Sequence, residues 1–471
     1  MSPFRRWWSA PSGRPLRTQQ RFSILLSLVS VVALIGGVGL QSGEAEASPS
    51  VWSVSPSPDI GSGTNILSDV SCTSSISCMA VGWEYDGSAD QTLVESWDGT
   101  AWSVISSPNA DSGTNVLEGI DCTSANDCMA VGGHDGLTLI ESWDGTAWSV
   151  MPSPNPVGNV STLGSVSCTT STNCVAVGSY YYGTLIESWD GTAWSITPSP
   201  NNGDYDNSLS GVSCTSPANC VAVGASPGGT LIESWNGTTW SIMPSPDPVT
   251  NEGSLTGVSC TSPTDCVAVG SYDIGSNSQT LVESWEGSVW TIVTSPDPDL
   301  NQFLIGLSCT SSTSCVAVGW QYNGKDSQTL VESWDGGAWS VTSSPSPSRH
   351  GNLLSRVSCS STTTCVVVGF SLKHVTKATV GQTLAEIGSP LPGPTITRFS
   401  PLSGKVGRTV TITGTNLADA NEVEFAGTEA TIISETATKV KVTVPAGATS
   451  GPVTVTTPEG TATTSNSFIV K

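Results

Sequence analysis

The chain is organised around a nine-residue segment, Glu95 to Ser103, with the sequence E-S-W-D-G-T-A-W-S. An Asp-Gly pair between alternating apolar residues predicts a β-hairpin, because glycine tolerates the positive φ that the turn requires. If the loop has four residues, Trp97 and Trp102 face each other across the hairpin, and such a pair stabilises a sheet by roughly 0.2–1 kcal/mol. Further copies of the segment begin at Glu141, Glu187, Glu233, Glu283 and Glu332.

Each hairpin belongs to a longer unit that begins with a pair of cysteines. In the first unit, residues 70–74 read V-S-C-T-S and residues 78–82 read C-M-A-V-G. The first cysteine of each unit is Cys72, Cys122, Cys168, Cys214, Cys260, Cys309 or Cys359, so the chain contains seven units spaced 46 to 50 residues apart. A period of roughly 40–50 residues with several short strands per unit is typical of propeller blades.

We expect four strands per unit, at about 66–72, 78–82, 92–97 and 101–105 in the first, and label them a to d. The seventh unit has no Trp hairpin after Glu386, whereas residues 51–56 near the N-terminus match strand d. An N-terminal strand that completes the last blade closes the ring and leaves only short sheet edges. The sequence therefore predicts an all-β fold with a seven-bladed β-propeller over residues 48–387.

The fourteen cysteines form seven C-x5-C pairs, each across the turn between strands a and b. On an exported chain, an even number at fixed spacing indicates disulfides, with buried free thiols as the alternative. No histidine recurs with the cysteines, so no zinc site is expected. The predicted pairs are Cys72–Cys78, Cys122–Cys128, Cys168–Cys174, Cys214–Cys220, Cys260–Cys266, Cys309–Cys315 and Cys359–Cys365.

Export is predicted from residues 1–47. Five arginines precede an uncharged apolar run from Phe22 to Leu40, and Ala45-Glu46-Ala47 has the small-x-small pattern of a cleavage site. These features are typical of a secretory signal peptide, which implies a secreted or cell-surface protein. The apolar run is also long enough to span a bilayer, so an uncleaved membrane anchor is the alternative.

The C-terminal part differs in pattern from the repeats. After a linker at 388–393 (G-S-P-L-P-G), strands such as 409–413 and 439–444 alternate apolar and polar residues. Residues 394–471 resemble the IPT/TIG family of immunoglobulin-like domains, which implies a β-sandwich of roughly seven strands. The matching positions are Pro394, Ile396, Phe399, Pro401, Gly404, Gly407, Val410, Ile412, Gly414, Asn416, Leu417, Val423 to Gly427, Val444, Pro445 and Gly451. The seven units in turn resemble bacterial secreted kelch-like propeller repeats of the form S-C-T-S-x-x-x-C-V-A-V-G, a resemblance that implies no particular activity.

Charge excludes several classes of partner. The formal net charge is −23, and no Lys or Arg occurs between Ser48 and Gly324. Nucleic-acid binding requires a basic surface to neutralise phosphates, so neither DNA nor RNA is an expected partner. Attraction to an anionic membrane is excluded for the same reason, which leaves an uncleaved anchor as the expected membrane contact.

The glutamate of strand c recurs in all seven units, at Glu95 in the first and Glu386 in the last. We expect a structural role for it rather than catalysis, because a buried carboxylate must be paired.

Function is expected on the face formed by the b–c and d–a loops, which we call the variable face. These loops differ between units, whereas the a–b and c–d turns barely change, and variable loops on a rigid scaffold commonly carry binding sites. Aromatic rings beside Asp, Asn and Gln suit sugars, although each ring alone also fits a packing role. The candidate ligand-binding residues are Trp83, Tyr85, His134, Tyr180, Tyr181, Tyr182, Tyr272, Trp320 and Tyr322.

The sequence favours a non-catalytic glycan-binding or adhesion protein, with two alternatives. A polysaccharide hydrolase or lyase would use His350 and His374 as acid/base groups and Arg349 as an anion clamp. A surface module that binds another protein is the second alternative. No cofactor is expected; calcium fits the acidic d–a loops, although none shows the D-x-D-x-D-G pattern.

Overall fold

The computed structural model describes residues 51–471 except 157–159, 182, 204, 247, 249–252, 300, 376–377, 390–392, 419 and 458–459. The described residues form strands and connecting turns, without a helix. Within these ranges no helical segment meets the length and hydropathy needed to cross a bilayer. The predicted signal peptide or anchor, residues 1–47, lies outside the described residues.

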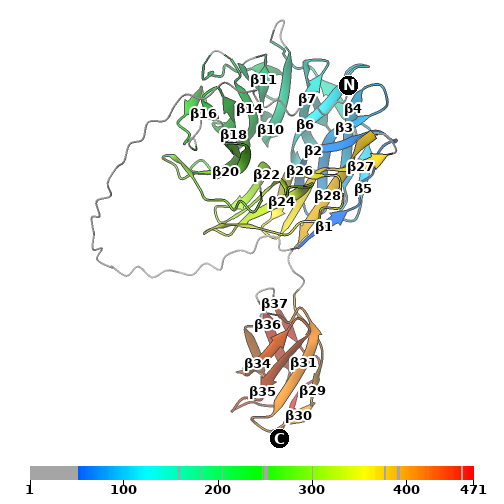
Figure 1. Ribbon diagram of the computed structural model, residues 1–471, viewed down its shortest axis with the longest axis vertical. Helices are drawn as coiled ribbons and strands as arrows, with labels where there is room; N and C mark the ends of the chain where they lie inside the picture. The colour runs from blue at the N-terminus through cyan, green and yellow to red at the C-terminus, as the bar shows by residue number, and fades with distance from the viewer. Residues whose placement is uncertain are drawn as a thin grey trace, which may run out of the picture. The chain divides into compact units, whose positions relative to one another are not determined.

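Seven four-stranded antiparallel sheets form the seven blades, as predicted (Figure 1). Blade 1 contains β2 (Asn65–Ser74), β3 (Ser77–Tyr85), β4 (Asp90–Trp97) and β5 (Trp102–Ile105). Blade 2 contains β6 (Asn115–Ser124), β7 (Asp127–His134), β8 (Leu137–Trp143) and β9 (Trp148–Met151). Blade 3 contains β10 (Ser161–Thr170), β11 (Asn173–Tyr180), β12 (Gly183–Trp189) and β13 (Trp194–Ile196).

The later blades repeat the same order of strands. Blade 4 contains β14 (Ser208–Ser216), β15 (Asn219–Ser226), β16 (Gly229–Trp235) and β17 (Trp240–Met243). Blade 5 contains β18 (Gly253–Ser262), β19 (Asp265–Ile274), β20 (Asn277–Trp285) and β21 (Trp290–Ile292). Blade 6 contains β22 (Asn301–Ser311), β23 (Ser314–Tyr322), β24 (Ser327–Trp334) and β25 (Trp339–Val341). Blade 7 contains β26 (Asn352–Ser361), β27 (Thr364–Val375), β28 (Ala378–Ser389) and β1 (Val51–Ser55).

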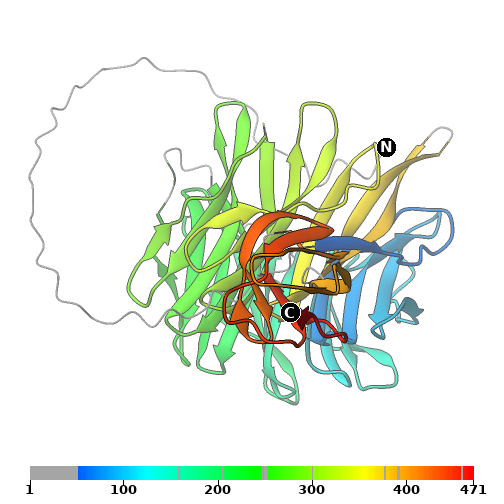
Figure 2. The ribbon, with the colours of Figure 1, turned by 90° about the horizontal axis from the view of Figure 1, so that it is seen from below.

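The N-terminal strand closes the ring, as the offset in the sequence predicted. β1 pairs antiparallel with β28, with Trp52 opposite Gly388. Figure 2 shows β1, in dark blue, beside the yellow strands of blade 7. The last strand continues to Ser389, so the predicted linker boundary at 388 lies two residues too early; Gly388 and Ser389 are needed to pair with β1.

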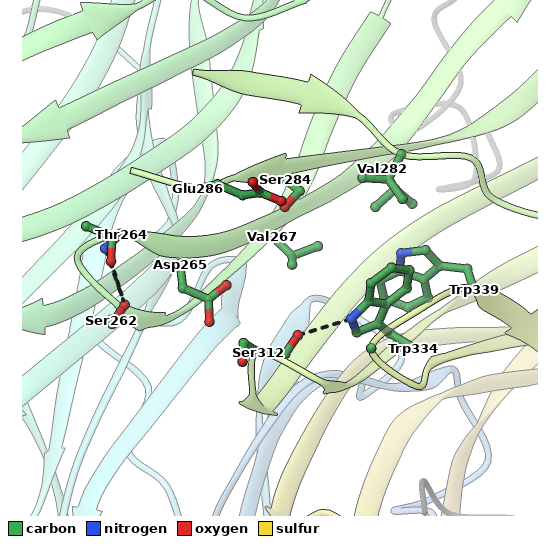
Figure 3. Close-up of a pocket in the computed structure, with 12 residues that line it drawn as sticks. Ser262, Thr264, Asp265, Val267, Val282, Ser284, Glu286, Ser312, Trp334 and Trp339 are labelled. Carbon is green, nitrogen blue, oxygen red and sulfur yellow. Dashed lines mark hydrogen bonds between the residues drawn. The ribbon is translucent and has the colours of Figure 1, made fainter. Parts of the chain in front are cut away.

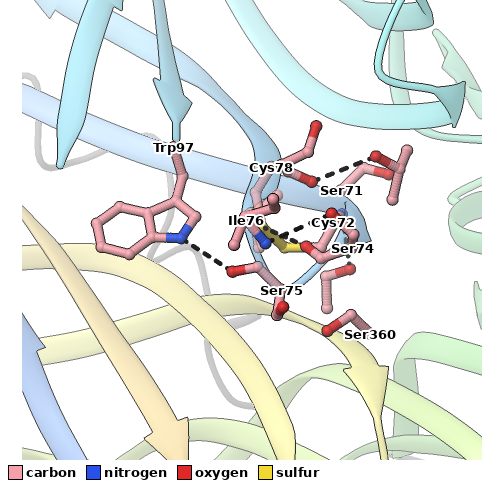
Figure 4. Close-up of a disulfide and its surroundings, with 12 residues drawn as sticks. Ser71, Cys72, Ser74, Ser75, Ile76, Cys78, Trp97 and Ser360 are labelled. Atoms are coloured by element: carbon pink, nitrogen blue, oxygen red, sulfur yellow. Dashed lines mark hydrogen bonds between the residues drawn. A yellow bond between two sulfur atoms is a disulfide. The ribbon is translucent and has the colours of Figure 1, made fainter. Parts of the chain in front are cut away.

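The tryptophan hairpin forms as expected. Trp97 and Trp102 are paired across β4 and β5 with their ring centroids 5.6 Å apart. Gly99 has a φ of 93°, and the Asp98 side chain accepts hydrogen bonds from the backbone N–H groups of Thr100 and Ala101. The indole N–H of Trp97 donates to the carbonyl of Ser75, so the c–d turn is bonded to the a–b turn of the same blade (Figure 4).

The hydrophobic core lies between the blades. Seven clusters of buried residues each combine side chains from two adjacent blades, including one that joins blade 7 to blade 1. In that cluster, Val366 and Val368 of β27 pack with Leu67 and Trp102 of blade 1. A blade therefore cannot bury its apolar faces without both neighbours, and closure of the ring is required to complete the core.

A ring of hydrogen bonds joins the innermost strands. In each blade the N–H of the first cysteine donates to the residue that precedes the first cysteine of the previous blade. Cys72 N–H, for example, donates to Ser358 Oγ at 2.9 Å, across the junction where the ring closes. The acceptors are Ser71, Asp121, Ser167, Ser213, Ser259, Ser308 and Ser358.

All seven predicted disulfides are present, with Cα atoms 3.9 to 4.0 Å apart. Each links directly opposed residues of strands a and b, such as Cys72 and Cys78 in Figure 4. The bridges therefore fix the register of the hairpin that carries the constant a–b turn.

The C-terminal domain is a β-sandwich, as predicted. One sheet has the order β29-β31-β35-β34 and another the order β33-β32-β36-β37, with a short β30–β38 pair beside them. Its core contains Phe399, Phe425 and Phe468. The strand bounds are β29 (Thr395–Ser400), β30 (Ser403–Gly404), β31 (Thr409–Thr415), β32 (Glu422–Phe425), β33 (Thr428–Glu429), β34 (Thr431–Thr436), β35 (Lys439–Thr443), β36 (Val453–Thr457), β37 (Gly460–Thr463) and β38 (Ile469–Val470).

Candidate functional site

The recurring glutamates are structural acceptors, and the structure shows why. Each is fully buried and accepts a hydrogen bond from a serine in the connection that enters its blade; Ser57 Oγ, for example, donates to Glu95 at 2.7 Å. The connection begins at strand d of the previous blade, so this bond joins neighbouring blades. We call the set the glutamate ring: Glu95, Glu141, Glu187, Glu233, Glu283, Glu332 and Glu386.

Burial makes these carboxyls weaker acids than an exposed glutamate. Desolvation raises the pKa of six of them to about 7, and the serine bond offsets only part of that rise. The six are Glu95, Glu141, Glu187, Glu233, Glu332 and Glu386. A raised pKa inside closed blade junctions is therefore a structural property here and does not indicate an acid catalyst.

The variable face carries the most exposed tyrosines of the described chain. Tyr85 is the last residue of β3, at the tip of the blade 1 hairpin, and is 40% exposed; Tyr181 lies at the tip of the blade 3 hairpin and is 68% exposed. Tyr205, in the connection between blades 3 and 4, is 58% exposed. Tyr205 is not among the ligand-binding residues predicted from the sequence, because the predicted aromatics all lie in b–c loops and Tyr205 lies in a d–a loop. The sequence feature that could have identified Tyr205 is its position in a d–a loop, which belongs to the same face.

Other predicted aromatics of this face are partly or fully covered. Trp83, Tyr180, Tyr272 and Tyr322 are half-buried, and the Tyr272 hydroxyl donates to Gln279 Oε1 at 2.9 Å. Tyr182 lies outside the described residues.

Trp320 was predicted to bind a ligand, but its side chain is buried. It is only 7% exposed and stacks on Phe303 of the paired strand, with ring centroids 4.5 Å apart. The register places the two residues directly opposite each other, so the indole packs within blade 6 and exposes no ring face for a ligand.

Exposed aliphatic side chains extend this surface around the ring. Leu137, Ile274 and Val375 lie at the b–c tips of blades 2, 5 and 7, and Val160 lies in the connection that enters blade 3. Their exposed fractions range from 42% to 67%. Together with the tyrosines they give the variable face a series of apolar tips separated by polar loops.

The histidines lie at two places on this face. His134 Nδ1 is 2.9 Å from Asp111 Oδ2, and this contact joins the blade 2 hairpin to the connection that enters the blade. The His134 contact lowers the pKa of Asp111, with a further contribution from the N–H of Gly113. At blade 7, the rings of His350 and His374 are in contact, with centroids 4.6 Å apart.

The surroundings of the histidine pair are polar and exposed. The hydroxyl of Thr379 lies 3.0 Å from His374 Nδ1, and Arg349 is exposed beside His350 in the sequence. The structure thus brings together the two histidines that the enzyme hypothesis requires. Among the described residues, no group of three or more His, Cys, Asp or Glu side chains is arranged to hold a metal ion.

Several acids of the d–a loops have a local structural role. Asp59 Oδ1 accepts the backbone N–H of Thr383 at 2.9 Å, and Asp297 Oδ1 accepts that of Thr280 at 3.1 Å. These bonds hold the connection against strand c, and asparagines such as Asn109 do the same in other blades. Asp204 and Asp247 lie outside the described residues.

A separate hollow lies on the opposite, constant face, between blades 5 and 6. It has a volume of about 520 Å³ and is lined by Asp265, Val267, Glu286, Trp334 and Trp339, among others (Figure 3). The hollow was not predicted from the sequence, because the a–b and c–d turns that line it barely change between units and function was expected on the variable face.

Comparison with protein families now identifies the C-terminal domain. Residues 394–469 match the family model of the IPT/TIG domain. This segment is an IPT/TIG domain. The resemblance found in the sequence is thereby confirmed. No curated protein matches the sequence of the chain.

Several solved structures are similar to this chain at low sequence identity. A fungal alcohol oxidase of the AA5 family, in complex with copper, has a TM-score of 0.51 at 12% identity, covering 88% of this chain and 99% of that one. YCF48 bound to a D1 peptide has a TM-score of 0.48 at 12% identity, covering 72% and 99%, and the WD40 β-propeller domain of Doa1 has 0.47 at 13%, covering 72% and 97%. At 12% identity the likeness to the oxidase concerns the fold alone, and no residue role follows from any of these proteins.

A β-propeller joined to an IPT/TIG domain is an architecture suited to a binding or adhesion module. The seven disulfides are consistent with an extracellular protein, because disulfides persist in oxidising compartments.

Proposed function

We propose that the protein is an exported, non-catalytic binding or adhesion protein that recognises an extracellular or cell-envelope glycan through the variable face. The observation that carries this proposal is the exposure of Tyr85, Tyr181 and Tyr205 on that face. A tyrosine ring stacks on the apolar face of a sugar, and its hydroxyl supplies a hydrogen bond.

Electrostatics narrows the class of glycan. The chain has a net charge of −23, and the first described basic residue is Lys325 of blade 6. Like-charge repulsion disfavours acidic glycans, so the preferred ligands are uncharged or amino-substituted polysaccharides.

The test is a binding screen of the purified protein against a glycan array and insoluble cell-wall polysaccharides. Tyr85→Ala, Tyr181→Ala and Tyr205→Ala should each weaken binding by up to about tenfold, the equivalent of about 1.4 kcal/mol. Ile76→Ala and Val104→Ala are matched controls, because both side chains are exposed but lie on the a–b turn and on the outer strand β5. The absence of binding to any glycan, or equal losses in the controls, would refute the proposal.

The second candidate function is a polysaccharide hydrolase or lyase that uses blade 7. The contact between His350 and His374 favours it, because it places two side chains that can accept or donate a proton side by side at the exposed surface. The double substitution of both histidines by alanine separates the two proposals. An enzyme would lose turnover, whereas a lectin would keep its affinity for the glycan.

The third candidate is a protein partner. Exposed tyrosines and aliphatic tips such as Val160 and Ile274 also suit the centre of a protein interface. This hypothesis predicts that a cell-surface protein, rather than a polysaccharide, binds to the same tyrosines.

A further inference from the structure

The hollow between blades 5 and 6 differs from the other junctions in two independent ways. The first concerns the residue after the first tryptophan of the hairpin. In the other hairpins this residue is Asp or Asn, and its side chain caps the c–d turn: Asp98, Asp144, Asp190, Asn236 and Asp335 each accept backbone N–H groups two and three residues later.

Blade 5 has Glu286 at this position. Among the described residues, neither the N–H of Ser288 nor that of Val289 donates to the Glu286 side chain, which lines the hollow instead (Figure 3). A glutamate is one methylene too long for the compact turn that Asp forms. The turn of blade 5 therefore lacks the side-chain cap of the other turns, and an exposed carboxylate lines the hollow between blades 5 and 6.

The second difference is the exposure of the side chain that follows the second cysteine. Val267 of β19 and Val293 after β21 stand where blade 1 has Met79 and Ile105 and where blade 2 has Met129 and Met151. Those larger side chains pack against the next blade and fill the junction. Val267 is half-buried and borders the open space, whereas the residue at this position is buried in the other six blades. Those six residues are Met79, Met129, Val175, Val221, Val316 and Val366.

The lining combines one aromatic wall with several polar groups. Trp334 and Trp339 of blade 6 are paired, with ring centroids 5.8 Å apart, and the Trp334 N–H donates to the carbonyl of Ser312. On the blade 5 side, Asp265 accepts the hydroxyl of Thr261 through Oδ2 only. The hydroxyls that line the hollow belong to Ser262, Thr264, Ser284 and Ser312.

We propose that this hollow is a second saccharide-binding site, on the face opposite to the variable loops, for a single uncharged or amino sugar unit. Indole and valine side chains suit the apolar face of a sugar ring, while two carboxylates and neighbouring hydroxyls accept hydrogen bonds from its hydroxyl or ammonium groups. The volume of about 520 Å³ falls within the range of about 300–1,000 Å³ of small-molecule sites. This site does not depend on the function proposed for the variable face, because the two share no residue.

The experiment is a tryptophan-fluorescence titration of the full chain with glucose, galactose, mannose, N-acetylglucosamine and glucosamine, with tetramethylammonium as an organic-cation probe. At least one sugar should give a saturable change. Val267→Met, which restores the residue of blades 1 and 2, and Glu286→Gln should each weaken that sugar at least tenfold.

Two matched controls separate this site from the variable face. Val221→Met makes the same change at the equivalent position of blade 4, and Tyr181→Ala alters only the variable face; both should leave the affinity unchanged. Circular dichroism and thermal melting should show that Val267→Met folds, and if it does not, Glu286→Gln decides the result. Absence of any sugar response, unchanged affinity in Glu286→Gln, or a response to tetramethylammonium alone would overturn the proposal.

Discussion

Replacing one member of the glutamate ring by glutamine should remove the pH dependence of propeller stability that comes from that site. Glu141 is fully buried, accepts one hydrogen bond from Ser107 Oγ at 2.6 Å, and has a buried Oε1 without a hydrogen-bond partner in the described structure. Desolvation raises the pKa of Glu141 from 4.5 to about 7. Because the folded state binds the proton more tightly than the unfolded chain, the stability that the proton provides is complete below pH 4.5. It is lost as the pH rises through 7.

The magnitude follows from the shift. A rise of about 2.5 pKa units at about 1.36 kcal/mol each gives about 3 kcal/mol of stability lost between pH 4.5 and pH 8. Glu141→Gln keeps an acceptor for Ser107 but carries no charge. At pH 8 the variant should therefore be more stable than the wild type by up to about 3 kcal/mol, whereas at pH 4.5 the two should agree within about 1 kcal/mol.

Thermal melting of the full chain at both pH values is a suitable assay. For a propeller of roughly 340 residues the unfolding entropy is about 0.7 kcal/mol/K, so the expected difference in Tm at pH 8 is about 4 °C. Asp144→Asn is the control, because Asp144 lies in the exposed turn of the same hairpin and its hydrogen bonds to Thr146 and Ala147 lower its pKa. A Glu141→Gln variant that is less stable than the wild type at both pH values would show that the ionised carboxylate stabilises the junction and would refute the reasoning.

Three further predictions test what stabilises the closed ring of blades. Replacing Cys168 and Cys174 together by serine should cost less than about 2 kcal/mol in urea denaturation, since the bridge closes a loop with a sequence separation of 6; a larger loss would mean that the bridge does more than fix register. Trp52→Ala should cost about 3–5 kcal/mol, because Trp52 is buried in the core between blades 6 and 7; a loss below about 1 kcal/mol would show that β1 is dispensable for closure. Ser167→Ala should cost about 1 kcal/mol, measured in the same way, because it removes the acceptor of the Cys214 N–H at 3.1 Å; no change would place water in that role.

The candidate site was only partly predictable. Exposed tips such as Tyr85 and Tyr181 followed from their place in variable loops, which must lie at the surface. Trp320 has the same position in its unit as the half-buried Trp83, yet it is buried, because the opposite residue of β22 is Phe303. Such a partner is set by strand register, which local sequence does not reveal.

The sequence alone determined the repeat, the four strands of each blade, the disulfide pairs and the closing strand β1. These follow from local signals: the Asp-Gly turn, the alternation of apolar residues and the fixed cysteine spacing. Only the tertiary structure decided which side chains meet between neighbouring blades and connections. Ser57 reaches Glu95, and Val267 borders a hollow beside Trp334, because neighbouring blades pack against each other. His350 meets His374 because the connection that enters blade 7 packs against strand β27 of that blade. The repeat period of the sequence does not predict these contacts, because they depend on how each blade packs against the next.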